Sequence, residues 1–192
     1  KNNWRKDKVV IRPGSGPKVM PGTHDTFAGY GLAWALTSNT PLRSTKMSAY
    51  EGGIRTPMIA HWPRVIKKGN ELTNQPGHVI DFMATCLDLA GLKYPTEFRN
   101  RRPLPLEGKS LVPILRGEKR LGHEALGWAT PRGRALIMGD WKIVRHADKL
   151  PWELYDLSTD PGETTNLAKN QPERVNEMAT RYETWRQRVG AR

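Results

Sequence analysis

Four short strand-like runs followed by one helical pattern fill the C-terminal third of the chain. The runs occupy residues 123–128, 134–138, 141–145 and 152–157. Gly139-Asp140 separates the second run from the third by the two residues typical of a tight hairpin turn. Because the runs are short and follow one another closely, the sequence predicts a small antiparallel sheet of four strands.

The helical pattern begins at Pro172, a residue that suits the first helical turn, and ends before Gly190. Its apolar side chains recur every three or four positions, at Val175, Met178, Ala179, Tyr182, Trp185 and Val189. This spacing places them on one face of a helix. We expect that face to pack against the sheet, which explains the stripe without a cofactor.

Two further elements are predicted in the middle of the chain. Residues 58–62 are apolar and lie between two prolines, which favours a buried strand of a parallel or mixed sheet. Residues 81–90 predict a helix, with Asp81 as its N-cap and Gly91 just beyond its end. The apolar residues cover most sides of this helix, so we expect it to be buried, with Cys86 as a core thiol and not a nucleophile.

Loops and linkers divide these patterns. Residues 30–36 fit either a short helix or an aromatic wall of a pocket. A basic, proline-rich linker spans residues 95–108, and a short turn-and-helix element follows it. We therefore expect two regions, residues 1–118 and residues 119–192, the second holding the four-stranded sheet and the terminal helix.

The chain is strongly basic, with 31 Lys and Arg against 19 Asp and Glu, a net charge of +12. A solvated basic surface explains most of this charge, and an anionic partner is the functional alternative. The basic clusters at residues 1–8 and 99–102 lack the pattern of a recognition helix or an aromatic RNA-binding motif, so nucleic acid is disfavoured. No apolar run approaches the 18 or so residues of a membrane span.

One polar loop offers chemistry of its own. Lys46 stands there among Arg43, Ser44, Thr45 and Ser48. A lysine is a compact cation with three donors, which suits a tetrahedral oxyanion. On this pattern alone an ordinary exposed lysine is the better interpretation. No metal-binding His/Cys spacing and no Gly-x-Ser-x-Gly motif accompanies it.

A family resemblance changes that interpretation. Asn39-Thr-Pro-Leu-Arg43, Lys46 and the run Glu51-Gly-Gly-Ile-Arg-Thr-Pro-Met-Ile-Ala-His-Trp-Pro63 resemble the second half of the arylsulfatase signature. Three more blocks follow in family order, at residues 78–91, 106–111 and 139–157. The chain thus resembles the C-terminal portion of a formylglycine-dependent sulfatase of the alkaline phosphatase superfamily.

The resemblance implies an alkaline-phosphatase-like α/β sandwich, with residues 1–118 as the C-terminal part of the catalytic domain and residues 119–192 as the C-terminal subdomain. It implies hydrolysis of sulfate esters of small molecules or glycans. In this family the lysine matching Lys46 bridges the sulfate and the formylglycine, so Lys46 is the predicted catalytic residue. His78 and Arg43 are predicted to bind substrate. A structural histidine and a surface ion pair are their respective alternatives.

The resemblance also implies a calcium ion and a formylglycine nucleophile. Residues 1–45 lack the family's Asp-Asn metal pair, and Cys86 is not followed by the nucleophile motif. We therefore expect both upstream of Lys1, assign no metal ligand here, and predict that this chain alone is inactive. The family suggests a periplasmic or secreted location.

Two alternatives stay open: a phosphate or phosphonate ester hydrolase of the same superfamily, and a non-catalytic polyanion-binding module. The chain also departs from many relatives at two places. Tyr50 stands where they have a histidine, and Ala129-Thr-Pro-Arg-Gly133 replaces Glu-His-Glu-Gly-Asn. If the second segment lines the substrate pocket, we expect a different substrate preference.

Overall fold

The computed structural model describes residues 7, 9–14, 17–19, 22–27, 29, 31–67, 69 and 71–191. Most of the basic cluster at residues 1–8, and Tyr30, lie outside these residues. The chain forms two compact units. We call them the sheet unit, Lys1–Thr56 with Gly127–Arg192, and the middle unit, Pro57–Leu126. The domain boundary near residue 118 stays a prediction.

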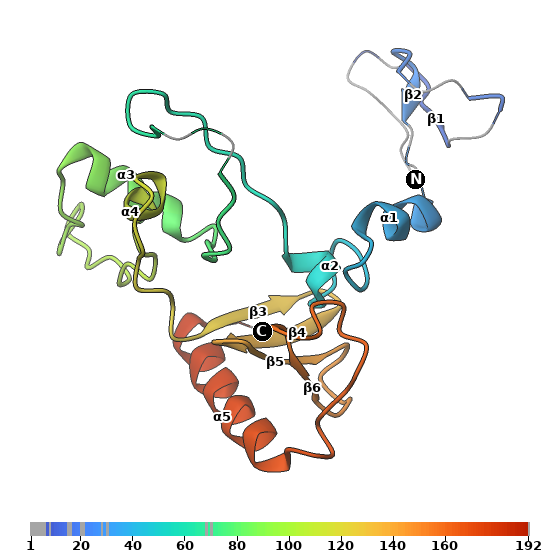
Figure 1. Cartoon of the computed structure of the whole chain (residues 1–192). Helices are drawn as coiled ribbons and strands as arrows, with labels where there is room; N and C mark the ends of the chain where they lie inside the picture. The colour runs from blue at the N-terminus through green and yellow to red at the C-terminus, as the bar shows by residue number, and fades with distance from the viewer. Residues whose placement is uncertain are drawn as a thin grey trace. The chain divides into compact units, whose positions relative to one another are not determined.

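The sheet unit is built on the four strands that the sequence predicts (Figure 1). They are β3 Leu126–Thr130, β4 Gly133–Met138, β5 Trp141–Arg145 and β6 Glu153–Asp156, in the order β3-β4-β5-β6. β5 pairs antiparallel with β4 and β6, with Ile143 opposite Leu136 and Leu154. Gly139 takes a φ of 57° in the β4–β5 turn, a conformation that glycine adopts without strain. The predicted antiparallel sheet and its hairpin are confirmed.

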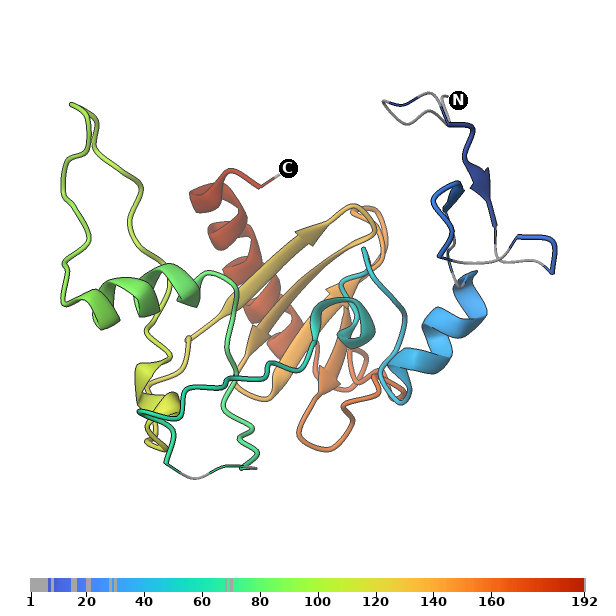
Figure 2. The same cartoon turned by 90° about the horizontal axis from the view of Figure 1, so that it is seen from above.

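One long helix, α5 Pro172–Val189, lies along a face of this sheet (Figure 2). It contacts β4 and β5, and Met178 and Tyr182 on that side are buried. Tyr182 meets Trp152 edge to face, with ring centroids 5.1 Å apart. The helix begins at Pro172 and ends at Gly190 with φ 65°, so both predicted ends are confirmed.

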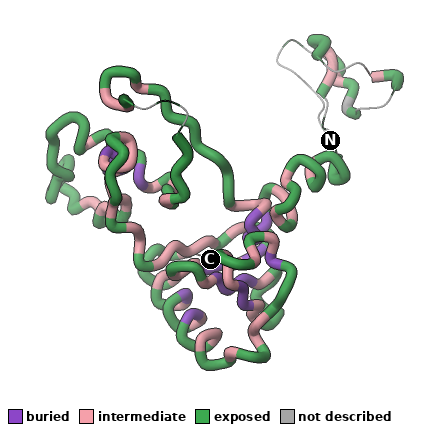
Figure 3. The backbone as a smooth tube through the Cα atoms, in the orientation of Figure 1, coloured by how far each residue is buried: buried purple, intermediate pink, exposed green. Residues whose placement is uncertain are grey.

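The core of the sheet unit receives a segment from far upstream in the sequence. Ala49 and Tyr50 pack with Ala135, Val144 and Tyr155 in one buried cluster. Figure 3 shows most of the buried residues in the sheet, in α5 and in this segment, and a few in the middle unit. The polar loop that precedes Ala49 is therefore anchored on the sheet.

Shorter elements complete the sheet unit. β1 Arg12–Pro13 and β2 Thr26–Phe27 form a parallel pair. They are followed by α1 Gly31–Asn39 and α2 Glu51–Ile54. Of the two interpretations of residues 30–36, the helix holds for the described residues, since α1 begins at Gly31.

The middle unit contains α3 Asp81–Ala90 and α4 Val112–Leu115. Gly91 ends α3 with φ 63°, as predicted. The N-cap prediction is wrong, because Ile80 occupies the cap position and Asp81 is the first helical residue. The Asp81 carboxylate instead accepts hydrogen bonds from backbone N–H groups outside the helix.

Two predictions of burial are also wrong. Residues 58–62 form no strand, and Ile59 is 93% exposed. On α3 only Asp81, Ala84 and Thr85 are buried, while Cys86 is exposed. An apolar pattern shows which side chains favour burial, not which surface covers them. Among the described residues, no strand pairs with 58–62 and only one face of α3 is covered. None of the helices in the described part is long and apolar enough to cross a bilayer.

Candidate active-site loop

Lys46 lies at the tip of a tight turn in the sheet unit. The Ser48 N–H donates to the Thr45 carbonyl oxygen at 3.1 Å, which leaves Lys46 and Met47 at the centre of a β-turn. Met47 has φ 75°, and Ser44 has φ 70°. Positive φ is uncommon for residues other than glycine and stores strain, so the surrounding structure must hold this loop in place. The Lys46 side chain is exposed at the tip.

Two adjacent glycines, Gly52 and Gly53, make room for the backbone of the loop. Asn39 Nδ2 donates to the carbonyl oxygens of Ser44, at 2.9 Å, and Gly52, at 2.7 Å. A Cβ atom on Gly52 would lie 2.3 Å from the Ser44 carbonyl oxygen, and one on Gly53 would lie 2.3 Å from that of Ser48. The Glu-Gly-Gly motif is explained by this close approach, which only glycine permits.

Three buried charges lie at the base of the loop. Lys142 Nζ is 2.8 Å from Glu51 Oε1 and 2.8 Å from Glu163 Oε1. Glu163 Oε2 accepts the Glu51 backbone N–H at 2.6 Å. Burial raises the pKa of Glu163 above its usual value, although the charge of Lys142 opposes this shift. We refer to Glu51, Lys142 and Glu163 as the buried triad.

The sequence reasoning missed this triad, although one signal was present. Lys142 lies on β5 directly before two apolar residues, Ile143 and Val144, which are fully buried. A lysine in such a run needs a carboxylate partner, because an unpaired buried charge is costly. Glu163, in contrast, stands in a turn and gives no local sign of burial.

Arg43, a predicted substrate ligand, is engaged by the protein itself. Its NH1 group donates to Tyr155 Oη at 2.9 Å, to Glu153 Oε2 at 3.1 Å and to the Glu163 carbonyl oxygen at 3.3 Å. Its guanidinium also lies over the Tyr50 ring, 4.1 Å from the centroid. These contacts fasten the loop to the sheet, and substrate binding by Arg43 stays a prediction.

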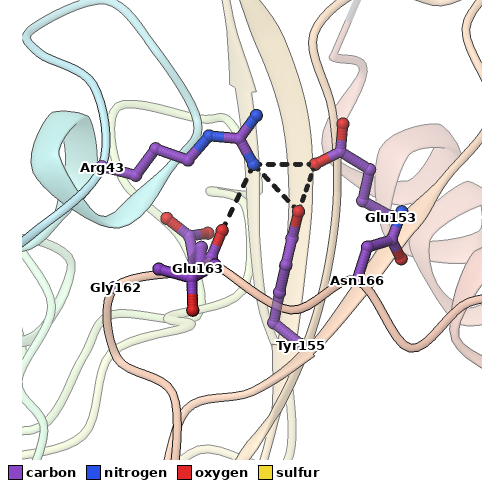
Figure 4. A pocket seen from close by; sticks show the side chains of 7 residues that line it. Arg43, Glu153, Tyr155, Gly162, Glu163 and Asn166 are labelled. Atoms are coloured by element: carbon purple, nitrogen blue, oxygen red, sulfur yellow. Dashed lines mark hydrogen bonds and ion pairs between the residues drawn. The ribbon is translucent and has the colours of Figure 1, made fainter.

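An open groove of about 600 Å³ lies beside Arg43. Figure 4 shows the guanidinium pointing towards Glu153 and Tyr155 at this groove. Burial, together with the hydrogen bond to Glu153, raises the pKa of Tyr50 to about 12 and that of Tyr155 further still. Both phenols therefore stay protonated at neutral pH, so neither can act as a base there.

The segment that departs from many relatives runs beside the lysine loop. Ser48 pairs with Arg132 in a parallel bridge, and a Cβ on Gly133 would lie 3.0 Å from Ala49 Cβ. Residues 129–133 and the Lys46 turn are thus neighbours within one unit. An effect of this departure on substrate preference stays a prediction.

His78 belongs to the middle unit, where the buried carboxylate of Asp81 gathers four donors. Asp81 accepts the backbone N–H groups of His78 and Lys109 at 2.9 and 2.8 Å. It also meets Arg120 NH2 at 3.0 Å and His123 Nε2 at 2.7 Å. Burial alone would raise the pKa of Asp81, but the hydrogen bonds outweigh it and the pKa is lowered. Asp81 is thus the centre of the middle unit's polar structure.

The His78 imidazole is half-buried. Its Nδ1 accepts the Ile80 N–H at 3.3 Å. Burial lowers the pKa of His78, although the charge of Asp81 opposes this, so the environment favours the neutral ring. A neutral imidazole binds an ester oxygen by donating a hydrogen bond and not by charge. Its role as a substrate ligand stays a prediction.

Among the described residues, no group of three or more His, Cys, Asp or Glu side chains could hold a metal ion. The described residues therefore offer no such ligand set for the calcium ion that the resemblance implies, and that ion stays a prediction. Cys86 lies exposed on α3 and is followed by Leu-Asp-Leu-Ala, which is not the formylglycine motif.

The fold of this chain is that of the C-terminal part of a sulfatase. The chain belongs to the sulfatase family: the family model described as N-sulphoglucosamine sulphohydrolase, C-terminal, matches residues 45–188. That range contains Lys46, the buried triad and Asp81. The resemblance found in the sequence is confirmed.

Curated relatives agree with this assignment. An uncharacterized sulfatase of Schizosaccharomyces pombe is 34% identical over 163 residues, which cover 82% of this chain and 29% of that protein. An N-acetylgalactosamine-6-O-sulfatase of Bacteroides thetaiotaomicron is 30% identical, and the match covers 92% of this chain and 35% of that protein. The chain therefore spans about a third of these relatives' length.

Solved structures support the fold. A structure from work on the metabolism of multiple glycosaminoglycans by Bacteroides thetaiotaomicron superimposes with a TM-score of 0.58 at 27% identity, covering 74% of this chain and 31% of that one. The crystal structure of Ps i-CgsB with k-i-k-neocarrahexaose gives a TM-score of 0.61 at 24% identity, covering 76% of this chain and 32% of that one. The predicted alkaline-phosphatase-like α/β class is confirmed.

Proposed function

We propose that this chain supplies the lysine that binds the sulfate group in a sulfatase, and that the whole protein containing it hydrolyses sulfate esters. One observation carries the proposal. Lys46 stands exposed at the tip of a strained turn that Asn39 and the Gly52-Gly53 pair hold in place. Strain maintained around an exposed cation favours a functional role over simple solubility.

The geometry suits transition-state stabilisation. The Lys46 ammonium offers three donors to the oxygens of a tetrahedral sulfate. Because the turn is already formed, little reorganisation is needed as negative charge develops on those oxygens. Lys46 thus acts as an electrostatic catalyst and not as a proton-transfer group.

The remaining parts of the reaction are proposed to come from elsewhere in a longer protein. The resemblance implies a calcium ion, which would supply Lewis-acid chemistry, and a formylglycine, which would supply the nucleophile. The described residues hold neither, so we predict that this chain alone shows no turnover. The same resemblance supports a periplasmic or secreted location.

We propose a sulfated glycan as the substrate class. One relative is named for N-acetylgalactosamine-6-sulfate, and a structural neighbour comes from work on glycosaminoglycan metabolism. The net charge of +12 also favours a polyanionic substrate. The departure at residues 129–133, beside the Lys46 turn, is the segment that we expect to set preference among such glycans.

A comparison of esters tests the reaction class. The whole protein, expressed with its formylglycine-generating enzyme, is assayed with 4-nitrophenyl sulfate, 4-nitrophenyl phosphate and a sulfated monosaccharide. We expect sulfate esters to be cleaved and the phosphate ester to be a poor substrate. Faster cleavage of the phosphate ester would establish the phosphoryl alternative instead.

Lys46→Ala in the same protein tests the proposed residue. Removing one preorganised donor should lower kcat by roughly 10²–10³-fold. The matched control is Lys149→Ala, which removes an exposed lysine of the same unit and should leave kcat unchanged. Full activity of Lys46→Ala would show that Lys46 is not catalytic. Salt-dependent glycan binding by this chain would then favour its role as a polyanion-binding module.

A further inference from the structure

The buried triad needs an explanation beyond stability. Lys142 is fully buried, and Glu51 and Glu163 are nearly so. Buried ion pairs seldom add net stability, because removing charges from water costs about as much as their attraction returns. Apolar residues of similar size would serve the core equally well.

Glu163 touches the lysine loop on both sides of Lys46. Its carboxylate accepts the backbone N–H of Glu51, downstream of Lys46, at 2.6 Å. Its backbone carbonyl accepts the Arg43 guanidinium, upstream of Lys46, at 3.3 Å. One residue thus clamps both ends of the segment that carries the strained turn.

Lys142 fixes the orientation of that clamp. It lies on β5 in the middle of the sheet, between the carboxylates of Glu51 and Glu163 at 2.8 Å from each. Without the ammonium group, two carboxylates would face each other in a buried site and repel. The central strand therefore sets where both carboxylates point.

The clamp is itself strained. Glu163 has φ 57°, so it joins Ser44 and Met47 as a third non-glycine residue with positive φ around this loop. The Asp160 carboxylate holds the turn by accepting the N–H groups of Thr164 and Thr165, both at 2.8 Å. Such conformations persist only where neighbouring contacts determine them.

We propose that Glu163 and Lys142 are positioning residues, which hold the Lys46 turn in the conformation that presents its ammonium group to the sulfate. The catalytic part of this inference rests on the proposed function. The structural part, that the triad keeps the turn rigid, stands without it. Loosening the clamp should affect the transition state more than substrate binding, because misplaced donors lose their preorganisation.

Hydrogen exchange tests the structural part and needs no activity. Amide exchange in the whole protein is followed in a loop peptide, residues 43–53, and in a sheet peptide, residues 133–145. We expect Glu163→Gln to speed exchange in the loop peptide by about tenfold and in the sheet peptide by less than about twofold. Equal acceleration in both peptides, or none in either, would overturn the proposal.

Control variants separate the clamp from general effects. Glu177→Gln changes an exposed glutamate on α5, and Lys149→Met changes an exposed lysine beyond β5; neither should alter exchange in the loop peptide. If Glu163→Gln does not fold, Asp160→Asn provides a milder loosening of the same turn. Asp160→Asn should accelerate amide exchange in the loop peptide but not in the sheet peptide. Unchanged exchange in the loop peptide would count against the clamp.

Kinetics test the catalytic part. With 4-nitrophenyl sulfate we expect Glu163→Gln to lower kcat by about tenfold or more, with KM changed by less than about threefold. The double variant Lys142→Met/Glu163→Leu removes the opposed charges, so its thermal midpoint should exceed that of Lys142→Met while kcat stays low. Recovery of kcat together with the midpoint would show that the triad serves stability alone. An inactive wild-type protein would contradict the proposed function. The hydrogen-exchange test would still decide whether the triad keeps the turn rigid.

Discussion

At the scale of single residues, the loop depends on two glycines, which have no side chain, as much as on its charged residues. Gly52 and Gly53 let the carbonyl oxygens of the lysine loop come closer than any Cβ atom would allow. The Glu-Gly-Gly motif is therefore a packing requirement of the loop. Glycine is needed here for space, since neither residue has a positive φ.

A substitution at Gly53 tests this requirement. Its new Cβ would meet the Ser48 carbonyl oxygen, a backbone atom that cannot move aside without moving the turn. We expect Gly53→Ala to lower the free energy of unfolding by about 1–3 kcal/mol in urea titration. The control is Gly122→Ala, where nothing lies within 4 Å of the added atom. A change there should stay within about 0.5 kcal/mol, and equal losses at both sites would refute the steric argument.

The Tyr50 hydroxyl provides a second test at this scale. It bonds Glu153 at 3.0 Å, and burial raises its pKa to about 12. In a spectrophotometric titration, Tyr50→Phe should remove one phenol that ionises well above pH 10, and the phenols titrating near pH 10 should be unaffected. Loss of a phenol titrating near pH 10 would show that Tyr50 is solvated and unpaired.

At the scale of elements, the buried Asp81 carboxylate holds segments of the middle unit together, as the buried triad holds the lysine loop to the sheet. Its carboxylate joins the start of α3 to Lys109, Arg120 and His123. Since α3 and α4 provide little buried apolar surface in the described chain, these polar contacts matter to the unit's order.

Asp81→Asn tests that role. Arg120 would lose a buried anionic partner, so we expect a loss of about 3–5 kcal/mol in the free energy of unfolding of this unit. Because folding lowers the pKa of Asp81, its stabilisation is present above the usual value of 3.8 and is lost as the pH falls through the folded pKa. Hydrogen exchange of residues 81–90 at pH 6 and pH 3 should therefore differ less in Asp81→Asn than in the wild type. An equal pH dependence in both proteins would refute the assignment.

Elements formed by local sequence were the ones that could be predicted. The β4–β5 hairpin and both ends of α5 follow from Gly139, Pro172 and Gly190, whose backbone preferences act within a few residues. The predictions of burial for residues 58–62 and for most of α3 were wrong because burial depends on packing partners that no local pattern specifies. Lys46 was found through its family motif. The triad was missed, because Glu163 meets Lys142 only after the chain has folded.

At the scale of the whole molecule, the net charge of +12 gives the chain a long-range attraction for anions that Lys46 alone cannot provide. Such attraction acts on approach and is screened by salt, whereas a contact inside a formed site is screened much less. If the proposed function holds, the net charge and the Lys46 turn make separate contributions to turnover of a polyanionic substrate. The two contributions can be told apart by ionic strength.

Substrates of different charge should respond differently to salt. The screening length falls from roughly 10 Å at 0.1 M to roughly 3 Å at 1 M salt. Over that range we expect KM for a sulfated tetrasaccharide to rise several-fold in the whole protein, and KM for the singly charged 4-nitrophenyl sulfate to change by less than about twofold. kcat for both should stay nearly constant, since the triad and the Lys46 turn are formed by short, partly buried contacts. A salt-independent KM for the tetrasaccharide would show that the basic surface serves solubility alone. An equal rise in KM for both substrates would show that salt weakens the contact with the sulfate group itself.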